Sequence, residues 1–92
     1  MLQKVKIALR IKTDAYDTRI NDLIDAAKKD LQLAGVVLPA QLDAICEQAI
    51  ITYCQLYFLG LSDDEFERLS KAYDLQKGML RSSTGYTNWE AQ

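Results

Sequence analysis

The sequence predicts an all-α protein, a compact four-helix bundle with a flexible C-terminal tail, and three observations support this fold. The 92 residues include only one Pro and four Gly, which favours helices over a turn-rich sheet. Apolar residues recur at helical spacing in four successive stretches of the chain. Residues 39–60 are apolar around most of a helix, as expected for a helix with neighbours on several sides. We therefore predict one helical domain over residues 1–81 and a tail over residues 82–92.

The first predicted helix covers about residues 2–12. Leu2, Val5 and Leu9 share one helical face, whereas Val5, Ile7, Leu9 and Ile11 also alternate as they would in a strand. We favour the helix, because the chain offers no second strand candidate for pairing.

The second predicted helix covers about residues 15–34, after Asp14 as its N-terminal cap. Gly35 is the expected left-handed residue at its end. Its apolar stripe consists of Tyr16, Ile20, Leu23, Ile24, Ala27, Leu31 and Ala34.

The third predicted helix, about residues 39–59, is the one around which the others are expected to pack. We expect Pro39 at its first position and Gly60 as the left-handed residue that closes its last turn. About eighteen helical residues would form a rod of roughly 27 Å. The apolar stripe contains Leu42, Ile45, Cys46, Ala49, Ile50, Tyr53, Cys54 and Tyr57.

The fourth predicted helix covers about residues 63–81 and begins with a capping box. The Ser62 oxygen would accept the backbone N–H three residues later, and the Glu65 side chain would reach back to the backbone N–H of Ser62. Its stripe is Phe66, Leu69, Tyr73, Gln76 and Leu80, broadened by Ala72, Leu75 and Met79.

Several classes of function lack support in the composition. There is no histidine, which removes the usual general base and the commonest metal ligand. Cys46 and Cys54 would lie ~12 Å apart along one helix, too far for a disulfide, so we interpret them as buried core residues of a protein made in a reducing cytoplasm. The acidic run 63–65 fits a helix N-terminus. We predict no enzyme activity, no cofactor and no metal, and neither a signal peptide nor a membrane span.

Charge is distributed unevenly along the chain. Residues 1–12 carry +4, residues 13–34 carry −2, residues 35–65 carry −5 and residues 66–92 carry +1. A basic end and an acidic middle can pair between copies of the chain or meet a charged partner, although solvated helix faces would give the same pattern. Sequence-specific DNA binding is disfavoured, because the pI is about 4.9 and residues 39–60 contain no Lys or Arg.

The tail combines polar residues with Tyr86 and Trp89, the only tryptophan. Aromatic side chains of this kind often dominate binding to a partner. The alternative is that both rings fold back onto the surface of the bundle.

The order of several short motifs resembles the tailed-phage head–tail connector proteins, also described as DNA-packaging adaptor or head completion proteins. The motifs of the first half are Leu9-Arg10-Ile11, Asp14 to Asp17, Ile20-x-x-Leu23-Ile24-x-x-Ala27, Leu31 and Gly35-Val36. Those of the second half are Ala49-Ile50-Ile51-Thr52-Tyr53, Phe58-x-Gly60, Ser62-Asp63, Phe66, Tyr73, Leu80 and Ser83-x-Gly85-Tyr86.

The resemblance implies a structural protein of the virion that is assembled in the host cytoplasm. Such proteins form a ring of about a dozen copies under the portal, extend the DNA channel and provide the docking platform for stopper or tail-completion proteins. DNA would pass through the channel without sequence-specific binding. By position, the segment from Arg81 to Trp89 would contact the portal, with Arg81, Tyr86 and Trp89 as candidate binding residues.

Self-assembly of the ring would use the basic N-terminal helix, with Lys4, Lys6 and Arg10 as candidates for pairing with the acidic middle of the next copy. The sequence leaves open whether the isolated protein is a monomer that assembles only on its target. Two other functions also stay open: a small helical adaptor or regulator that binds one partner through its tail, and an acidic DNA mimic or weak DNA-binding module.

Overall fold

The computed structural model describes residues 1–82, and helices dominate that part of the chain. Its four helices are α1 (Leu2–Leu9), α2 (Asp17–Leu33), α3 (Ala44–Phe58) and α4 (Asp63–Ser82). No strand occurs within residues 1–82. The predicted all-α fold is therefore confirmed, and the alternating apolar residues near the N-terminus belong to a helix. None of these helices is long and apolar enough to cross a membrane.

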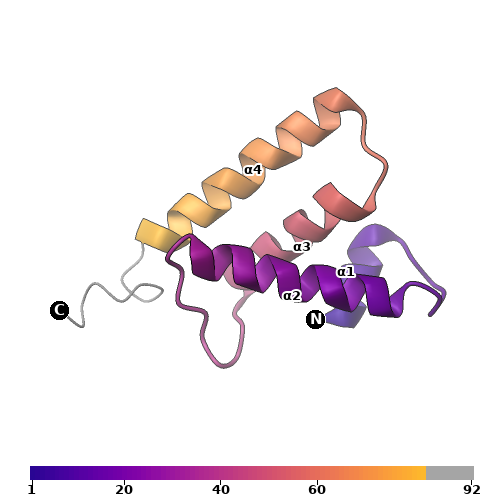
Figure 1. Cartoon of the computed structure of the whole chain (residues 1–92), viewed down its shortest axis with the longest axis horizontal. Coiled ribbons are helices and arrows are strands. Elements are labelled where there is room, and N and C mark those ends of the chain that lie inside the picture. The colour runs from indigo at the N-terminus through magenta and orange to yellow at the C-terminus, as the bar shows by residue number, and fades with distance from the viewer. Residues whose placement is uncertain (83–92) are drawn as a thin grey trace.

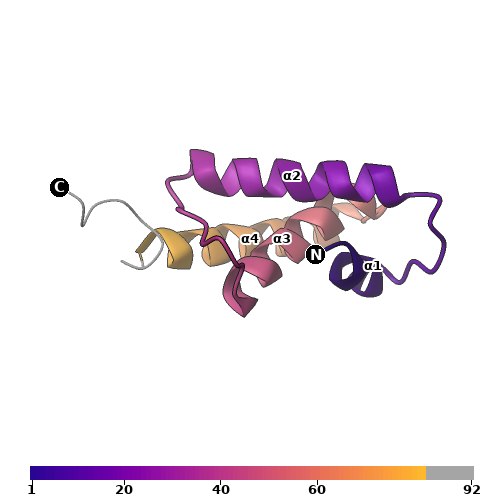
Figure 2. The same cartoon turned by 90° about the horizontal axis from the view of Figure 1, so that it is seen from below.

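Helix α3 lies in the middle of the molecule and contacts each of the other three helices (Figure 1). Helices α2 and α4 flank it and run in the same direction, because each is antiparallel to α3. The view from below shows α2 on one side and α1, α3 and α4 together on the other (Figure 2), and α1 contacts both α2 and α3. The molecule measures 45 × 29 × 19 Å. Its shortest dimension corresponds to about two helix diameters, so each outer helix is covered on one side only.

Helix α3 is the central element, as predicted, but the face that it buries differs in part from the predicted stripe. Cys46, Ala49, Ile50 and Cys54 are buried as expected. Ile45 and Tyr57, predicted on the same stripe, are half exposed, whereas Thr52 and Leu56 are buried instead. The Thr52 hydroxyl donates to the Gln48 carbonyl at 3.0 Å, which makes its burial possible. Within residues 1–82 the buried apolar residues are Val5, Leu9, Ile20, Leu23, Ile24, Ala27, Leu31, Val36, Cys46, Ala49, Ile50, Cys54, Leu56, Tyr73 and Leu80.

The predicted bounds of the third helix are wrong at its start. Helix α3 begins at Ala44 and not at Pro39. Asp43 is the N-cap, and its carboxylate accepts the Cys46 backbone N–H at 3.0 Å. A side chain that satisfies a free N–H determines the start more strongly than a proline that merely tolerates a helix. At the other end Leu59 is extended, and Gly60 does not have the expected positive φ.

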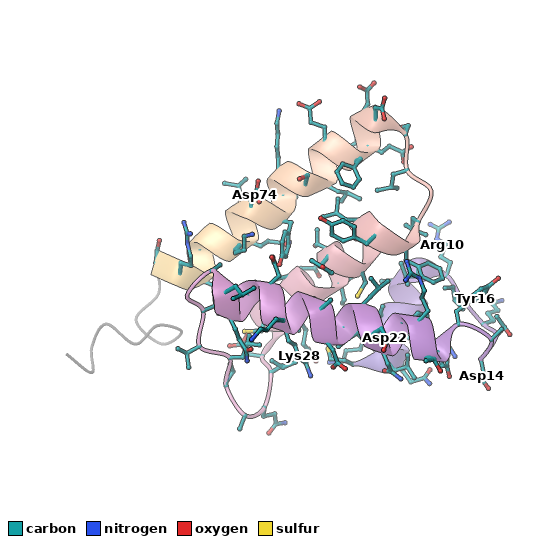
Figure 3. All side chains as sticks on the ribbon, viewed as in Figure 1. Arg10, Asp14, Tyr16, Asp22, Lys28 and Asp74 are labelled. Atoms are coloured by element: carbon teal, nitrogen blue, oxygen red, sulfur yellow. The ribbon has the colours of Figure 1, made fainter. Side chains whose placement is uncertain are left out.

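The bounds of the first two helices also differ from the prediction. Helix α1 ends at Leu9, because Arg10 adopts a left-handed conformation with φ 60°. The backbone N–H of Arg10 and that of Ile11 then bond to carbonyls of the last turn, at 3.1 and 2.9 Å, as in a Schellman ending. Helix α2 begins at Asp17 after Tyr16, whose side chain makes no capping bond. Asp14 is therefore not its cap. Figure 3 shows Arg10, Asp14 and Tyr16 together at this end of the molecule.

Two other predicted helix boundaries are confirmed. Gly35 has φ 97° after the end of α2, the conformation that glycine adopts most readily. Ser62 precedes α4, and its oxygen accepts the Glu65 backbone N–H at 3.3 Å. The Glu65 carboxylate accepts the Ser62 hydroxyl at 2.9 Å, in place of the backbone N–H expected in a capping box.

A polar contact joins the two flanking helices across the bundle. The Tyr73 hydroxyl of α4 donates to the Asp30 carboxylate of α2 at 2.5 Å. Lys77 adds a longer bond to the same carboxylate oxygen, at 3.3 Å, and its ammonium group lies 4.9 Å from the centre of the Tyr73 ring. Burial, and secondarily Asp30, raise the pKa of Tyr73. The hydroxyl therefore stays protonated and holds α4 near α2.

Candidate functional site

The described part of the chain contains no grouping typical of a chemical centre. No three Cys, Asp or Glu side chains within residues 1–82 are arranged to hold a metal ion. Cys46 and Cys54 are free and buried, and burial raises the pKa of each thiol to about 11. Because the thiolate is the reactive form, neither cysteine is activated.

Lys6, one of the predicted self-assembly residues, is used inside the chain. Its side chain leaves α1 among apolar residues, and only 4% of the residue is exposed. The ammonium group lies 2.8 Å from an Asp14 oxygen and 2.9 Å from an Asp17 oxygen. These carboxylates raise the pKa of Lys6, and Lys6 in turn lowers the pKa of Asp14. Lys6 thus joins α1 to the start of α2, and its charge is already neutralised within the subunit.

The other two predicted self-assembly residues lie on the surface. The Lys4 ammonium group bonds to both Glu47 carboxylate oxygens, at 2.8 and 2.9 Å, and this pair joins α1 to α3. The Lys4 side chain is still mostly exposed. Arg10 is exposed and forms no ion pair with another residue of the described chain. Arg10 is therefore the one of the three whose charge is free to meet a partner.

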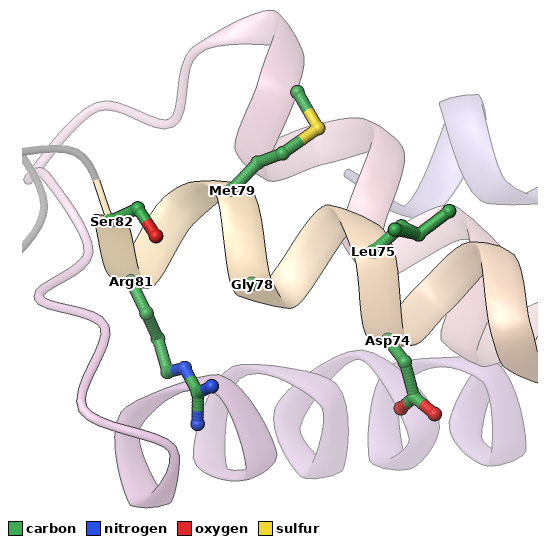
Figure 4. Close-up of a pocket in the computed structure, with 6 residues that line it drawn as sticks. All are labelled: Asp74, Leu75, Gly78, Met79, Arg81 and Ser82. Carbon is green, nitrogen blue, oxygen red and sulfur yellow. The ribbon is translucent and has the colours of Figure 1, made fainter.

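The outer side of α4 carries a shallow hollow near the end of the described chain (Figure 4). Gly78 forms its floor, and a side chain added there would meet nothing within 4 Å. Leu75 and Met79 project along one side of the hollow, and Asp74 and Arg81 along the other. Leu75 and Met79 are 69% and 63% exposed. The predicted broad apolar stripe of this helix is therefore covered only along Tyr73 and Leu80.

Arg81, predicted to bind a partner, lines this hollow together with Ser82. Its guanidinium group is exposed at the last turn of α4, so it is accessible at the position where the tail begins. Tyr86 and Trp89, predicted for the same role, lie outside the described residues. The structure therefore brings Arg81 close to Leu75 and Met79, which were predicted on the apolar stripe of this helix and are exposed.

A second exposed apolar area lies where α3 leads into α4. Tyr57 and Phe66 are both half exposed, and their rings pack edge to face with centroids 6.2 Å apart. Asp63, Asp64 and Glu65 immediately precede Phe66 and are all exposed. They belong to the first turn of α4, where negative charge is stabilised by the helix dipole.

The hollow on α4 was not predicted from the sequence, although one signal pointed to it. Leu75 and Met79 lie one turn apart and far from the line that joins Tyr73 to Leu80 on a helical projection. An apolar arc that wide requires neighbours on two sides, and the bundle supplies only one. The bundle therefore leaves Leu75 and Met79 exposed one turn apart, which makes this surface a candidate for contact with another protein.

These features describe a small helical bundle with exposed apolar side chains on several helices. The model of the phage connector protein family matches residues 1–87, and the chain belongs to that family. Membership supports a connector role in a phage particle, in contact with other head or tail proteins. Searches of curated proteins and of solved structures return no match.

Proposed function

We propose that this protein is the head–tail connector of a tailed phage or prophage, and that copies of it form a ring under the portal. The observation that carries the proposal is the family match over residues 1–87, which spans all four helices. The ring would extend the DNA channel and provide the docking platform for stopper or tail-completion proteins. Its place would be the head–tail interface of the virion, after assembly in the host cytoplasm.

The physical character of the subunit supports this proposal. A closed ring requires a heterologous interface, in which one face of a copy meets a different face of the next. The subunit is thin and has exposed apolar side chains on several helices. Its net charge of −2 is compatible with DNA that slides past without tight phosphate binding.

Docking to the portal is assigned to the end of α4 and the tail that follows it. Arg81 is exposed at the last turn of α4, and Tyr86 and Trp89 follow within a few residues. Tyrosine, tryptophan and arginine are the residues that most often dominate binding energy at protein interfaces. We therefore assign portal binding to Arg81, Tyr86 and Trp89 together.

Self-assembly through the basic N-terminus is proposed for Arg10 first, with Lys4 in support. Reversal of Lys6 would place a third carboxylate beside Asp14 and Asp17 and damage the subunit itself, because unpaired buried charge is strongly destabilising. A test of assembly therefore changes Arg10 and leaves Lys6 intact. Arg10→Glu should weaken assembly without lowering the melting temperature, and an unchanged assembly would remove Arg10 from the interface.

The test of the proposed function uses the full chain and the portal protein of the phage or prophage that encodes it. Negative-stain microscopy and native mass spectrometry should show rings of about a dozen copies, either alone or on added portal. Termination after Ser82 should abolish docking to the portal while the fold persists. A strict monomer that ignores the portal and captures a different protein would overturn the proposal in favour of a small helical adaptor.

A further inference from the structure

Among the described residues, the outer faces of α2 and α4 both carry exposed apolar side chains. The face of α4 opposite α3 contains Leu75, Met79 and the hollow over Gly78. The face of α2 opposite α3 contains Leu33, which at 76% is the most exposed large apolar side chain of the described residues. One face is therefore hollowed and the other carries a protruding side chain.

The charges on these two faces follow complementary orders. From its N-terminal end, the outer face of α2 presents Asp22, Asp25 and Lys29 before Leu33. The outer face of α4 presents Arg68, Lys71 and Asp74 in turn before Gly78. Each series advances by three or four residues, so successive members lie about one turn apart on one side of a helix. The signs of the two series are opposite at every step.

Parallel packing of the two faces brings these opposite charges to the same level. With Leu33 placed over Gly78, Lys29 lies one turn back and so does Asp74. Asp25 and Lys71 lie about two turns back, and Asp22 and Arg68 about three. In antiparallel packing the acidic residues of α2 would lie beyond the end of α4, and Lys29 would meet Arg81. Charge complementarity therefore selects the parallel arrangement.

The charged side chains are available for such contacts. All six are exposed, and within the described chain only Lys71 forms an ion pair. Its partner Glu67 is four residues away on the same helix at 3.2 Å, with both side chains mostly exposed. Exposed pairs of this kind contribute little to stability, so Lys71 can exchange this partner for another.

We propose that the outer face of α2 in one copy packs in parallel on the outer face of α4 in the next, with Leu33 in the hollow over Gly78. The inference rests on the proposed ring and identifies the two faces that would form it. Helices α2 and α4 run in the same direction, well apart at their N-terminal ends and close together at their C-terminal ends (Figures 1 and 3), and their outer faces are two different surfaces of the subunit. A contact between them is therefore heterologous and leaves the same two faces free at each end of a growing row.

The contact is small in area. Its apolar part consists of Leu33 against Leu75 and Met79, well short of the ~800 Å² per partner that stable interfaces bury. Two free copies should therefore associate weakly, and a closed ring, in which every copy makes two contacts, should be the stable species.

Cross-linking tests the arrangement even where association is weak. Asp25→Cys and Lys71→Cys are combined in one full-length chain, which is treated with a short bismaleimide reagent. Head-to-tail contacts should give a ladder of covalent dimers, trimers and larger species. Each single variant should stop at the dimer, because only like positions can join. The wild-type thiols, Cys46 and Cys54, are buried and serve as the unreactive background.

A second double variant checks the register, since Asp25→Cys combined with Asp63→Cys should give no ladder. Rings in native mass spectrometry without a ladder from the Asp25 and Lys71 pair would overturn this inference and leave the proposed function intact. Absence of both rings and ladder, alone and on added portal, would overturn the two together.

Charge reversal provides an independent test of the same pairing. Asp25→Lys alone places like charges opposite each other in every contact, and so does Lys71→Asp alone. Each should lower the yield of assembled species about tenfold or more, and the double reversal should restore it. Arg19→Asp, a reversal of an exposed charge that belongs to neither series, is the control. Single reversals without effect, or a double variant that is not rescued, would contradict the pairing.

The hollow is tested by filling it. Gly78→Ala and Gly78→Gln should both leave the subunit folded, because nothing lies within 4 Å of an added Cβ and both residues favour a helix more than glycine does. Only the glutamine is long enough to occupy the space of Leu33. Assembly should fall at least about tenfold for Gly78→Gln and stay close to wild type for Gly78→Ala. Equal assembly of both variants would show that the hollow is not occupied.

Discussion

The ammonium group of Lys6 is held between two carboxylates, although Lys6 belongs to the most basic stretch of the chain. In the sequence, Lys4, Lys6 and Arg10 look equivalent, because all three are basic and precede the acidic segments. The fold separates them: Lys6 is buried, Lys4 pairs with Glu47, and Arg10 is free among the described residues. Whether each of these cations is buried, paired or free depends on which side of α1 faces α2. The charge pattern of the sequence does not reveal that orientation.

The Lys6–Asp14 pair predicts a loss of stability in acid. The pKa of Asp14 in the folded protein lies below its usual value of 3.8, so the unfolded chain binds the proton first as the pH falls. The stabilisation is complete above that value and decreases as the pH drops through the folded pKa. Lys6→Met should lower stability at pH 6 and reduce this acid dependence, as measured by urea unfolding from pH 6 to pH 2. An unchanged acid dependence in the variant would contradict the assignment.

The two cysteines should react slowly with water-soluble thiol reagents. Burial raises the pKa of Cys46 and of Cys54 to about 11, so at pH 8 nearly all of each thiol is protonated as well as inaccessible. We expect little modification by a charged aromatic disulfide in native buffer and rapid modification of two thiols in denaturant. Rapid modification of the native protein would show that α3 opens readily at its core-facing side.

At the scale of the elements, the sequence predicts the helices better than their bounds. All four were expected, because apolar spacing at helical period is a signal that each stretch carries by itself. The start of α3 was missed by five residues, since Pro39 and Asp43 both suit a helix start and only the tertiary path of residues 36–43 decides between them. The end of α1 was missed because Arg10 occupies a conformation usually taken by glycine.

Removal of the Asp43 cap should destabilise the protein. The carboxylate accepts the Cys46 backbone N–H at 3.0 Å, and loss of an N-cap bond of this kind costs about 1 kcal/mol. Asp43→Ala should therefore lower the free energy of unfolding by about that amount in a urea titration. Asp43→Asn is the matched control, because asparagine caps a helix equally well. If the helix began at Pro39, both variants would have nearly the same free energy of unfolding as the wild type.

Tertiary packing also decides which apolar side chains form the candidate surfaces. The apolar residues of α4 are visible in the sequence, but their division between core and surface depends on how many neighbours the helix has. A bundle about two helices thick covers Tyr73 and Leu80 and leaves Leu75 and Met79 outside. The hollow over Gly78 follows from that arrangement and from the missing side chain.

At the scale of the whole molecule, the described residues form a core of their own. Within residues 1–82 the buried apolar residues lie between Val5 and Leu80, and α4 extends to Ser82. A chain that ends at Ser82 should therefore unfold cooperatively, with a melting temperature within a few degrees of the full-length protein. Circular dichroism and calorimetry would check this. A large loss of stability would mean that Tyr86 and Trp89 pack on the bundle, as the alternative interpretation of the tail requires.

Arg10 has a consequence for any attempt to engineer the isolated subunit. A non-glycine residue at φ 60° carries on the order of 1 kcal/mol of backbone strain, and Arg10→Gly would relieve it. The same replacement would remove the only one of the three N-terminal candidate cations that has no partner inside the described chain. Under the proposed role of Arg10 in assembly, the variant with the more stable monomer would form rings less well, so a screen by melting temperature alone would select against assembly.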